Sequence, residues 1–139
     1  MDTRRPSVPL AQRTLAGNMR SQVDYRLTRR RVLRDFQRGR VSRLDICDAH
    51  PELIRAATYV GEHSTQDCPI CEAGKLRLVS YVYGDDLRAA NGRCITSRAE
   101  LAKLGASVDE MRCYIVEVCV GCKWNHLVRS YALGRRHAG

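Results

Sequence analysis

Four of the seven cysteines in this 139-residue chain form two pairs, each with two residues between its partners. Cys68 and Cys71 lie in Asp-Cys-Pro-Ile-Cys-Glu-Ala-Gly-Lys, and Cys119 and Cys122 lie in Val-Cys-Val-Gly-Cys-Lys. This spacing lets both sulfurs of a tight turn point at one ion, and two such turns complete a tetrahedral Zn²⁺ site with four thiolate ligands. The sequence therefore predicts a structural zinc centre.

The two pairs are far apart, because 47 residues (72–118) separate them, whereas about 15 to 20 is usual. An inserted segment must therefore loop out between them. Residues 97–100, Ser-Arg-Ala-Glu, form a capping box. Leu101 and Leu104 follow, and Gly105 provides a stop signal. We expect the insertion to carry a short helix that ends at Gly105.

Runs of β-branched and aromatic residues predict three strands, at 76–83, 113–118 and 127–133. Three antiparallel strands with two cysteine turns make a zinc ribbon. Large apolar residues occupy both alternating positions of these strands, so each face of the sheet needs a cover. We expect the inserted helix to cover one face and the N-terminal helices to cover the other.

Charged residues also occur within these strands. Arg77, Glu117 and Arg129, one on each strand, are hypothesised to meet as a cross-strand charge cluster. The alternative is three unrelated surface charges.

The net charge of +9 is confined to the first third of the chain. Residues 1–43 hold 12 Arg and three acidic residues, whereas residues 44–139 hold 12 basic and 12 acidic residues. A polyanion, most often nucleic acid, is the usual partner of such a segment. The planar guanidinium fork of Arg suits phosphate and base contacts. A GC-rich genome would also favour Arg over Lys without functional meaning, and this alternative stays open.

A helix is predicted over residues 19–38, closed by Gly39. Its apolar positions fall on two arcs, and arginines lie around it or just past its end. We predict that these arginines contact nucleic acid; the alternative is a solvated helix. The candidate residues are Arg20, Arg26, Arg29, Arg30, Arg31, Arg34, Arg38 and Arg40.

Two capping patterns predict shorter packing helices, from Ser42 to Cys47 and from Pro51 to Gly61. The expected organisation is a flexible basic arm (1–17), an Arg-rich helical segment (18–61), the zinc ribbon with its inserted helix (62–133) and a flexible tail (134–139).

The other cysteines, Cys47, Cys94 and Cys113, lack ligand spacing and are expected to be buried small hydrophobic residues. His126, four residues after Cys122, is an alternative ligand if one cysteine fails to reach the ion. The first cysteine pair is also similar to thiol oxidoreductase sites. Those sites begin a helix, whereas a strand pattern follows here, so we expect no enzymatic activity.

Several motifs together resemble an actinobacterial family of small proteins of unknown function. They are Cys47-Asp48-Ala49-His50-Pro51, Leu53-Ile54-Arg55-Ala56-Ala57, Cys68-Pro69-Ile70-Cys71, residues 78–84, and residues 117–131. The resemblance spans about Gln22 to Leu133. It implies a zinc-ribbon-like cytoplasmic protein whose four paired cysteines match those of the family, and it implies no activity.

The sequence thus predicts a non-enzymatic α+β protein, a three-stranded antiparallel zinc ribbon with a helical insertion, packed with N-terminal helices and binding Zn²⁺. No stretch approaches about 18 apolar residues and no secretory signal is evident, so we expect a cytoplasmic protein with neither a membrane nor a small-molecule partner. The expected partner is nucleic acid or a nucleoprotein complex, with RNA polymerase preferred and the ribosome second. The alternatives are a zinc-thiolate redox sensor and a protein–protein adaptor using Tyr81, Tyr83, Trp124 and Tyr131.

Overall fold

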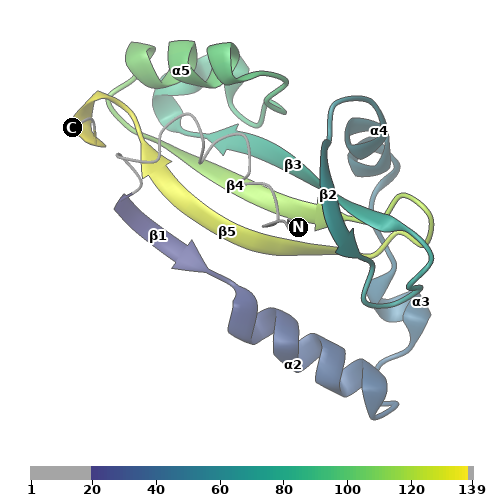
Figure 1. Cartoon of the computed structure of the whole chain (residues 1–139). Coiled ribbons are helices and arrows are strands. Elements are labelled where there is room, and N and C mark those ends of the chain that lie inside the picture. Colours follow the sequence, from purple (N-terminus) through teal and green to yellow (C-terminus); the bar gives the residue numbers. More distant parts are fainter. Residues whose placement is uncertain (1–19, 138–139) are drawn as a thin grey trace, which may run out of the picture.

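A computed structural model describes residues 20–137, which form one antiparallel sheet with helices around it (Figure 1). The strands are β1 (Arg20–Asp24), β2 (Glu62–Asp67), β3 (Lys75–Tyr83), β4 (Met111–Val118) and β5 (Asn125–Leu133). The α-helices are α2 (Arg26–Gln37), α3 (Arg43–Ile46), α4 (Pro51–Tyr59) and α5 (Arg98–Ser107). Two 3-10 helices are η2 (Asp85–Ala90) and η3 (Arg135–His137).

The strand order in the sheet is β1-β5-β4-β3-β2, and every neighbouring pair is antiparallel. Strands β2 to β5 are neighbours in chain order, whereas β1 pairs with the outer edge of β5. The three strands expected from the sequence correspond to β3, β4 and β5. The α+β class is therefore confirmed, but the sheet has five strands where three were expected.

Strand β1 replaces the first part of the helix expected over residues 19–38. Val23 pairs with Ser130, Asp24 pairs with Arg129, and the backbone N–H of Tyr25 donates to the carbonyl of Val128 at 3.1 Å. The exposed backbone of the β5 edge outweighs the helical preference of this segment, as tertiary pairing often does. The helix consequently starts only at Arg26.

The two short helices after α2 begin at the expected residues. Ser42 caps α3 with a complete capping box, because Asp45 N–H donates to its side chain and its own N–H donates to the Asp45 carboxylate. Pro51 is the first residue of α4, and the His50 side chain accepts a hydrogen bond from Glu52 N–H at 3.0 Å. These local signals explain why the sequence predicted both helices.

The inserted helix α5 is capped as expected, since Ser97 accepts a hydrogen bond from Glu100 N–H. It continues through Gly105 to Ser107, so the expected end at Gly105 is wrong. Beyond β5, Gly134 has a φ of +123°, and a Cβ there would approach the Asp109 carbonyl oxygen to 2.5 Å. Only glycine fits this close approach.

The expected flexible ends are only partly covered by the described residues. The tail expected at 134–139 begins as η3, where Arg135 pairs with Asp109 at 2.8 Å and Arg136 pairs with Glu110 at 3.0 Å. The arm expected at 1–17 lies outside the described residues. Within residues 20–137, no helix has the length and apolar character needed to cross a membrane.

Helices α5 and α2 lie at opposite ends of the sheet (Figure 1). Leu101 of α5 packs into a cluster with Val82 and Ile115, whereas α2 packs near Leu76. In the β3–β4 register, Leu76, Val82 and Ile115 lie on one face, so α2 shares this face with α5. The expectation that all N-terminal helices cover the opposite face is therefore wrong for α2.

The opposite face is covered in part by α4. Ala57 of α4 is fully buried against Val79 of β3 and Val118 of β4. Val79 pairs with Val116, and Val118 lies two residues further along β4, so both valines point to this face. The rest of this face carries tyrosines, described below. The sheet thus has one face with a cover at both ends and one face with a cover at a single end.

Candidate metal centre

The antiparallel pairing of β3 and β4 brings the two cysteine pairs together. Arg77, near the start of β3, pairs with Val118, the last residue of β4. The turn that precedes β3 therefore lies beside the turn that follows β4, although 47 residues (72–118) separate the cysteine pairs. The insertion that carries η2 and α5 extends from the other end of these strands.

The two turns have the same backbone arrangement. The Cys68 carbonyl accepts a hydrogen bond from Glu72 N–H at 3.0 Å, and the Cys119 carbonyl accepts one from Lys123 N–H at 2.9 Å. Glu72 and Lys123 both adopt left-handed backbone conformations, with φ of 58° and 75°. Two turns of one geometry thus present two sulfurs each.

The four sulfurs converge in one cluster. All four Sγ atoms, of Cys68, Cys71, Cys119 and Cys122, lie within 4.8 Å of one another. The Cys68–Cys122 separation is 3.6 Å and the Cys71–Cys119 separation is 3.7 Å. A tetrahedron of sulfurs with Zn–S bonds of 2.3 Å has edges of about 3.8 Å. The predicted cysteines therefore come together, and they could hold a metal ion.

The surroundings affect these thiols differently. Hydrogen bonds from the backbone N–H groups of Ala73 and Gly74 lower the pKa of Cys71 to about 7. Burial raises the pKa of Cys68 to about 12 and that of Cys122 to about 11. A bound cation would favour the thiolate of each ligand and release the thiol protons.

A buried carboxylate connects this cluster to α2. Glu117 is 4% exposed, and its Oε2 accepts hydrogen bonds from Arg29 Nε at 2.8 Å and from Trp124 Nε1 at 2.7 Å. Trp124 follows the second cysteine turn and is itself 1% exposed. Because Arg29 belongs to α2, this network fixes the helix against the end of the sheet that carries the cysteine cluster.

The cross-strand charge cluster hypothesised around Glu117 does not include Arg77. Glu117 pairs with Leu78, so Arg77 points to the other face. There its guanidinium donates to the carbonyls of Ala57 and Thr58, at the end of α4. Glu117 instead pairs with Arg29 of α2, which is 88 residues away in the sequence. Spacing alone does not reveal this contact.

A fifth cysteine, Cys47, lies next to the cluster, a position that the spacing of the cysteines does not predict. Cys47 follows α3 as its C-cap, and its Sγ lies 3.6 Å from the Sγ of Cys122. It is half-buried and packs against the Leu76–Trp124 cluster, so the expectation of a buried small hydrophobic residue is met only in part for Cys47. Cys113 is fully buried in the core as expected, and Cys94 is half-buried on the α4 side of the sheet.

The alternative histidine ligand is placed elsewhere. The His126 ring stacks on Trp124 with 5.8 Å between centroids, and its Nδ1 lies 2.7 Å from the Leu127 carbonyl oxygen. Among the described residues, the group of side chains close enough to share an ion consists of the four paired cysteines.

The predicted nucleic-acid-binding arginines do not form a single group. Arg29 pairs with buried Glu117, Arg26 pairs with Asp24 at 2.9 Å, and Arg40 lies 3.7 Å from Asp35. Arg20 begins β1. Arg30, Arg31, Arg34 and Arg38 are exposed, and within residues 20–137 none of them pairs with a carboxylate.

These four arginines lie on one side of α2 and its C-cap. At about 100° per residue, positions 30, 34, 38 and 31 fall within an arc of about 100°. Leu27 falls on the same side and is 74% exposed. We call Arg30, Arg31, Arg34 and Arg38 the arginine stripe.

The aromatic residues proposed for an adaptor surface are split by the fold. Trp124 and Tyr131 are buried, so they cannot contact a partner. Tyr81 and Tyr83 instead line an open groove of about 610 Å³ on the face partly covered by α4, together with Tyr114.

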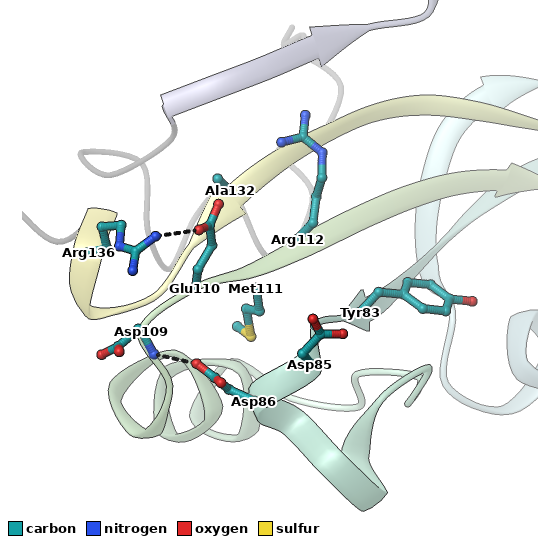
Figure 2. A pocket seen from close by; sticks show the side chains of 10 residues that line it. Tyr83, Asp85, Asp86, Asp109, Glu110, Met111, Arg112, Ala132 and Arg136 are labelled. Atoms are coloured by element: carbon teal, nitrogen blue, oxygen red, sulfur yellow. Dashed lines mark hydrogen bonds and ion pairs between the residues drawn. The ribbon is translucent and has the colours of Figure 1, made fainter.

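A separate hollow of about 470 Å³ lies between η2, β4 and η3 (Figure 2). Glu110 pairs there with Arg136 at 3.0 Å, and Asp86 accepts a hydrogen bond from Asp109 N–H at 3.3 Å. Arg112 donates to Ser130 Oγ. These contacts hold the insertion and the C-terminal residues to the sheet.

The fold and the site define an α+β protein that carries a four-cysteine cluster at one end of its antiparallel sheet. The chain belongs to a family of unknown function, DUF5318, whose family model matches residues 16–139. It is 45% identical over 112 residues to uncharacterized proteins of Mycobacterium bovis and Mycobacterium tuberculosis, which covers 81% of this chain and 81% of each relative. The actinobacterial resemblance is therefore confirmed. No solved structure matches the chain.

Proposed function

We propose that this protein is a non-enzymatic, zinc-stabilised module that binds the phosphate backbone of a nucleic acid through the arginine stripe. The observation that carries the proposal is the exposure of four guanidinium groups on one side of α2 without a carboxylate partner in residues 20–137. A neighbouring carboxylate would neutralise the charge of a surface arginine. Without one, the guanidinium groups of the arginine stripe can pair with an external anion.

Zinc is the proposed ion because of the donor set. Four cysteine sulfurs are the soft ligands that Zn²⁺ takes in closed structural sites, and such sites leave no open position for catalysis. Sulfur separations of 3.6 and 3.7 Å support a tetrahedral arrangement. The ion would stabilise the fold and supply no reaction.

The metal centre supports the proposed binding surface through contacts with α2. Val32 and Leu33 of α2 pack against the cluster that contains Cys68 and Cys119. Arg29 pairs with Glu117 on the same side of the helix. The opposite side, with the arginine stripe, is thereby held toward solvent.

The charge distribution supports a polyanionic partner. The stripe runs from Arg30 to Arg38, eight residue steps or about 12 Å along the helix axis, which is long enough to contact more than one phosphate. All of the excess positive charge, +9, lies in residues 1–43. We propose a nucleoprotein complex as the partner, preferably one that contains RNA polymerase, with the ribosome second.

Salt dependence tests this proposal. The triple variant Arg30→Ala, Arg31→Ala, Arg34→Ala is compared with Arg55→Ala, Arg98→Ala, Lys103→Ala, which removes three exposed positive charges from α4 and α5. If each stripe arginine contacts one phosphate, the log–log salt slope for duplex DNA should flatten by about 2.7. The control should keep the parental slope, and equal slopes for both variants would refute the proposal.

Affinity purification from native lysate, with and without nuclease, separates the two partner complexes. Recovery of polymerase subunits would support the preferred partner, and recovery of ribosomal proteins would support the second. A nuclease-sensitive contact would show that nucleic acid forms the bridge.

The second candidate function is a protein–protein adaptor. The open groove lined by Tyr81, Tyr83 and Tyr114 favours it, since aromatic side chains provide large contact areas at interfaces. In that case binding would be insensitive to the stripe variants and would be lost on replacing Tyr83 by Ala.

A further inference from the structure

The fifth sulfur beside the four-cysteine cluster has no role in the proposed function. Cys47 lies at the end of α3, and its thiol donates a hydrogen bond to the Sγ of Cys122 over 3.6 Å. It is not among the four sulfurs that lie within 4.8 Å of one another. A metal ion held by those four would therefore leave Cys47 as a free thiol in contact with one ligand.

Exposure distinguishes the sulfurs of this cluster. Cys68 and Cys119 are buried, whereas Cys47, Cys71 and Cys122 are half-buried. A small oxidant in solvent therefore reaches these three sulfurs more readily than the two interior ones. Of the two half-buried ligands, Cys122 lies 3.6 Å from the half-buried Cys47, whereas Cys71 lies 3.7 Å from the buried ligand Cys119. Accessible thiolates next to a second thiol are the arrangement in which reversible oxidation occurs.

We propose that Cys122 is a site of oxidation by hydroperoxides and that Cys47 is its resolving thiol. The Cys122 thiolate attacks a peroxide oxygen, the O–O bond breaks, and Cys122 becomes a sulfenic acid. The Cys47 sulfur then attacks the Cys122 sulfur, the S–O bond breaks, and a disulfide forms with release of water. The two thiols lose two electrons in total, and the hydroperoxide gains them.

The competing partner is Cys68, whose Sγ is also 3.6 Å from that of Cys122. Cys68 is fully buried, and its Sγ accepts a hydrogen bond from Ile70 N–H at 3.4 Å. With metal bound, it would also remain a ligand beside Cys71 and Cys119. Cys47 carries none of these constraints. A disulfide requires an S–S distance near 2.05 Å, so the two sulfurs need to approach by about 1.5 Å.

Formation of this disulfide would remove one of four metal ligands. Three sulfurs no longer complete the closed site, and the ion is released. The inference rests on the metal centre of the proposed function and does not depend on what the arginine stripe binds. It makes the cluster a hydroperoxide-sensitive site with a defined product.

Peptide mapping tests the proposal directly. Reduced protein loaded with Zn²⁺ is treated with hydrogen peroxide, alkylated and digested with trypsin. Cleavage after Arg43, Arg55, Lys75, Arg112 and Lys123 places Cys47 in peptide 44–55, Cys68 and Cys71 in peptide 56–75, and Cys113, Cys119 and Cys122 in peptide 113–123. The expected first product links 44–55 to 113–123, with fragmentation of the linked peptides assigning the bond to Cys122 rather than to Cys113 or Cys119. A link from 56–75 to 113–123 as the first product would overturn the proposal.

Variants give a second readout. Cys47→Ser should hold Zn²⁺ when reduced, but its peroxide-induced metal release should not be reversed by dithiothreitol, because unresolved Cys122 proceeds to sulfinic acid. Cys94→Ser, which lies on the other face of the sheet, should release and rebind metal as the parent does. If Cys47→Ser recovers its metal as fully as the parent, Cys47 is not the resolving thiol.

Metal content before oxidation separates the two hypotheses. Reduced parent protein that holds no Zn²⁺ would contradict the proposed metal centre, and with it the metal release inferred here. Zinc-loaded protein that forms no link between 44–55 and 113–123 would contradict the resolving role of Cys47 and leave the metal centre intact.

Discussion

At the α5 end of the sheet, eleven buried residues form one apolar cluster, whereas the cluster at the cysteine end has four, of which two are cysteines. The hydrophobic effect provides about 25 cal/mol per Å² of buried apolar area, so the larger cluster stabilises its end without help. In the smaller cluster the fully buried residues other than cysteine are Leu76 and Trp124, and the residues packed against it, such as Val32 and Ile46, are only partly buried. We therefore expect one end of the sheet to depend on side-chain packing and the other on the ion proposed for the cysteine cluster.

The largest expected effect is that of Cys119→Ser. It removes a ligand, and the apparent binding free energy of structural Zn²⁺, roughly 10–16 kcal/mol in zinc-finger peptides, contributes directly to folding. We expect loss of bound metal by elemental analysis and loss of hydrogen-exchange protection around the two cysteine turns, with α5 still protected. Equal loss of protection at both ends would show that they do not differ as described. Cys94→Ser is the matched control.

The converse change is Leu101→Ala at the α5 end. Leu101 is fully buried, so truncation should lower the free energy of unfolding by about 3 kcal/mol. Metal content should stay unchanged, because the substitution is in the other cluster. Denaturant titration together with elemental analysis measures both quantities. The control is Leu44→Ala at an 88% exposed position, where we expect almost no change.

Acidification should weaken metal binding at the cysteine end. Burial raises the pKa of Cys68 to about 12 and that of Cys122 to about 11, so both are protonated near neutral pH without metal. Metal binding then displaces at least two protons, and the affinity should fall roughly 100-fold for each unit decrease in pH. Competition with a chromogenic chelator between pH 6 and 8 measures this dependence. A pH-independent affinity would contradict a thiolate site.

A smaller effect is expected for Glu117→Gln, which tests the link between the cysteine end and α2. The substitution removes the charge that Arg29 faces, and a hydrogen bond to a charged group contributes about 2 kcal/mol. Hydrogen exchange in α2 should increase more than exchange in α5. Glu110→Gln removes an exposed partner of Arg136 and should change stability by less than about 1 kcal/mol.

Local signals in the sequence predicted much of the fold. Capping residues located the starts of α3, α4 and α5, and the density of β-branched residues located β3, β4 and β5. Strand β2, Glu-His-Ser-Thr-Gln-Asp, escaped detection because it is polar and lies at an edge of the sheet, where no apolar pattern is needed. Strand β1 escaped because its partner, β5, is more than 100 residues away.

The site was predictable to the extent that it is local. Two residues between cysteines fix the geometry of a turn, so Cys68, Cys71, Cys119 and Cys122 were identified from spacing alone. Cys47 approaches the cluster only because α3 packs beside the second cysteine turn, and no spacing encodes that contact. The division of the arginines into those that pair internally and those of the stripe likewise depends on tertiary structure.

Strand β1 occupies one lengthwise border of the nine-residue β5. A shortened chain that begins after Asp24 would leave the backbone donors and acceptors of β5 unsatisfied along that border. Such edges pair readily with strands of other molecules. We therefore expect removal of residues 1–24 to promote self-association, even though every cysteine and every helix that the structure describes would still be present.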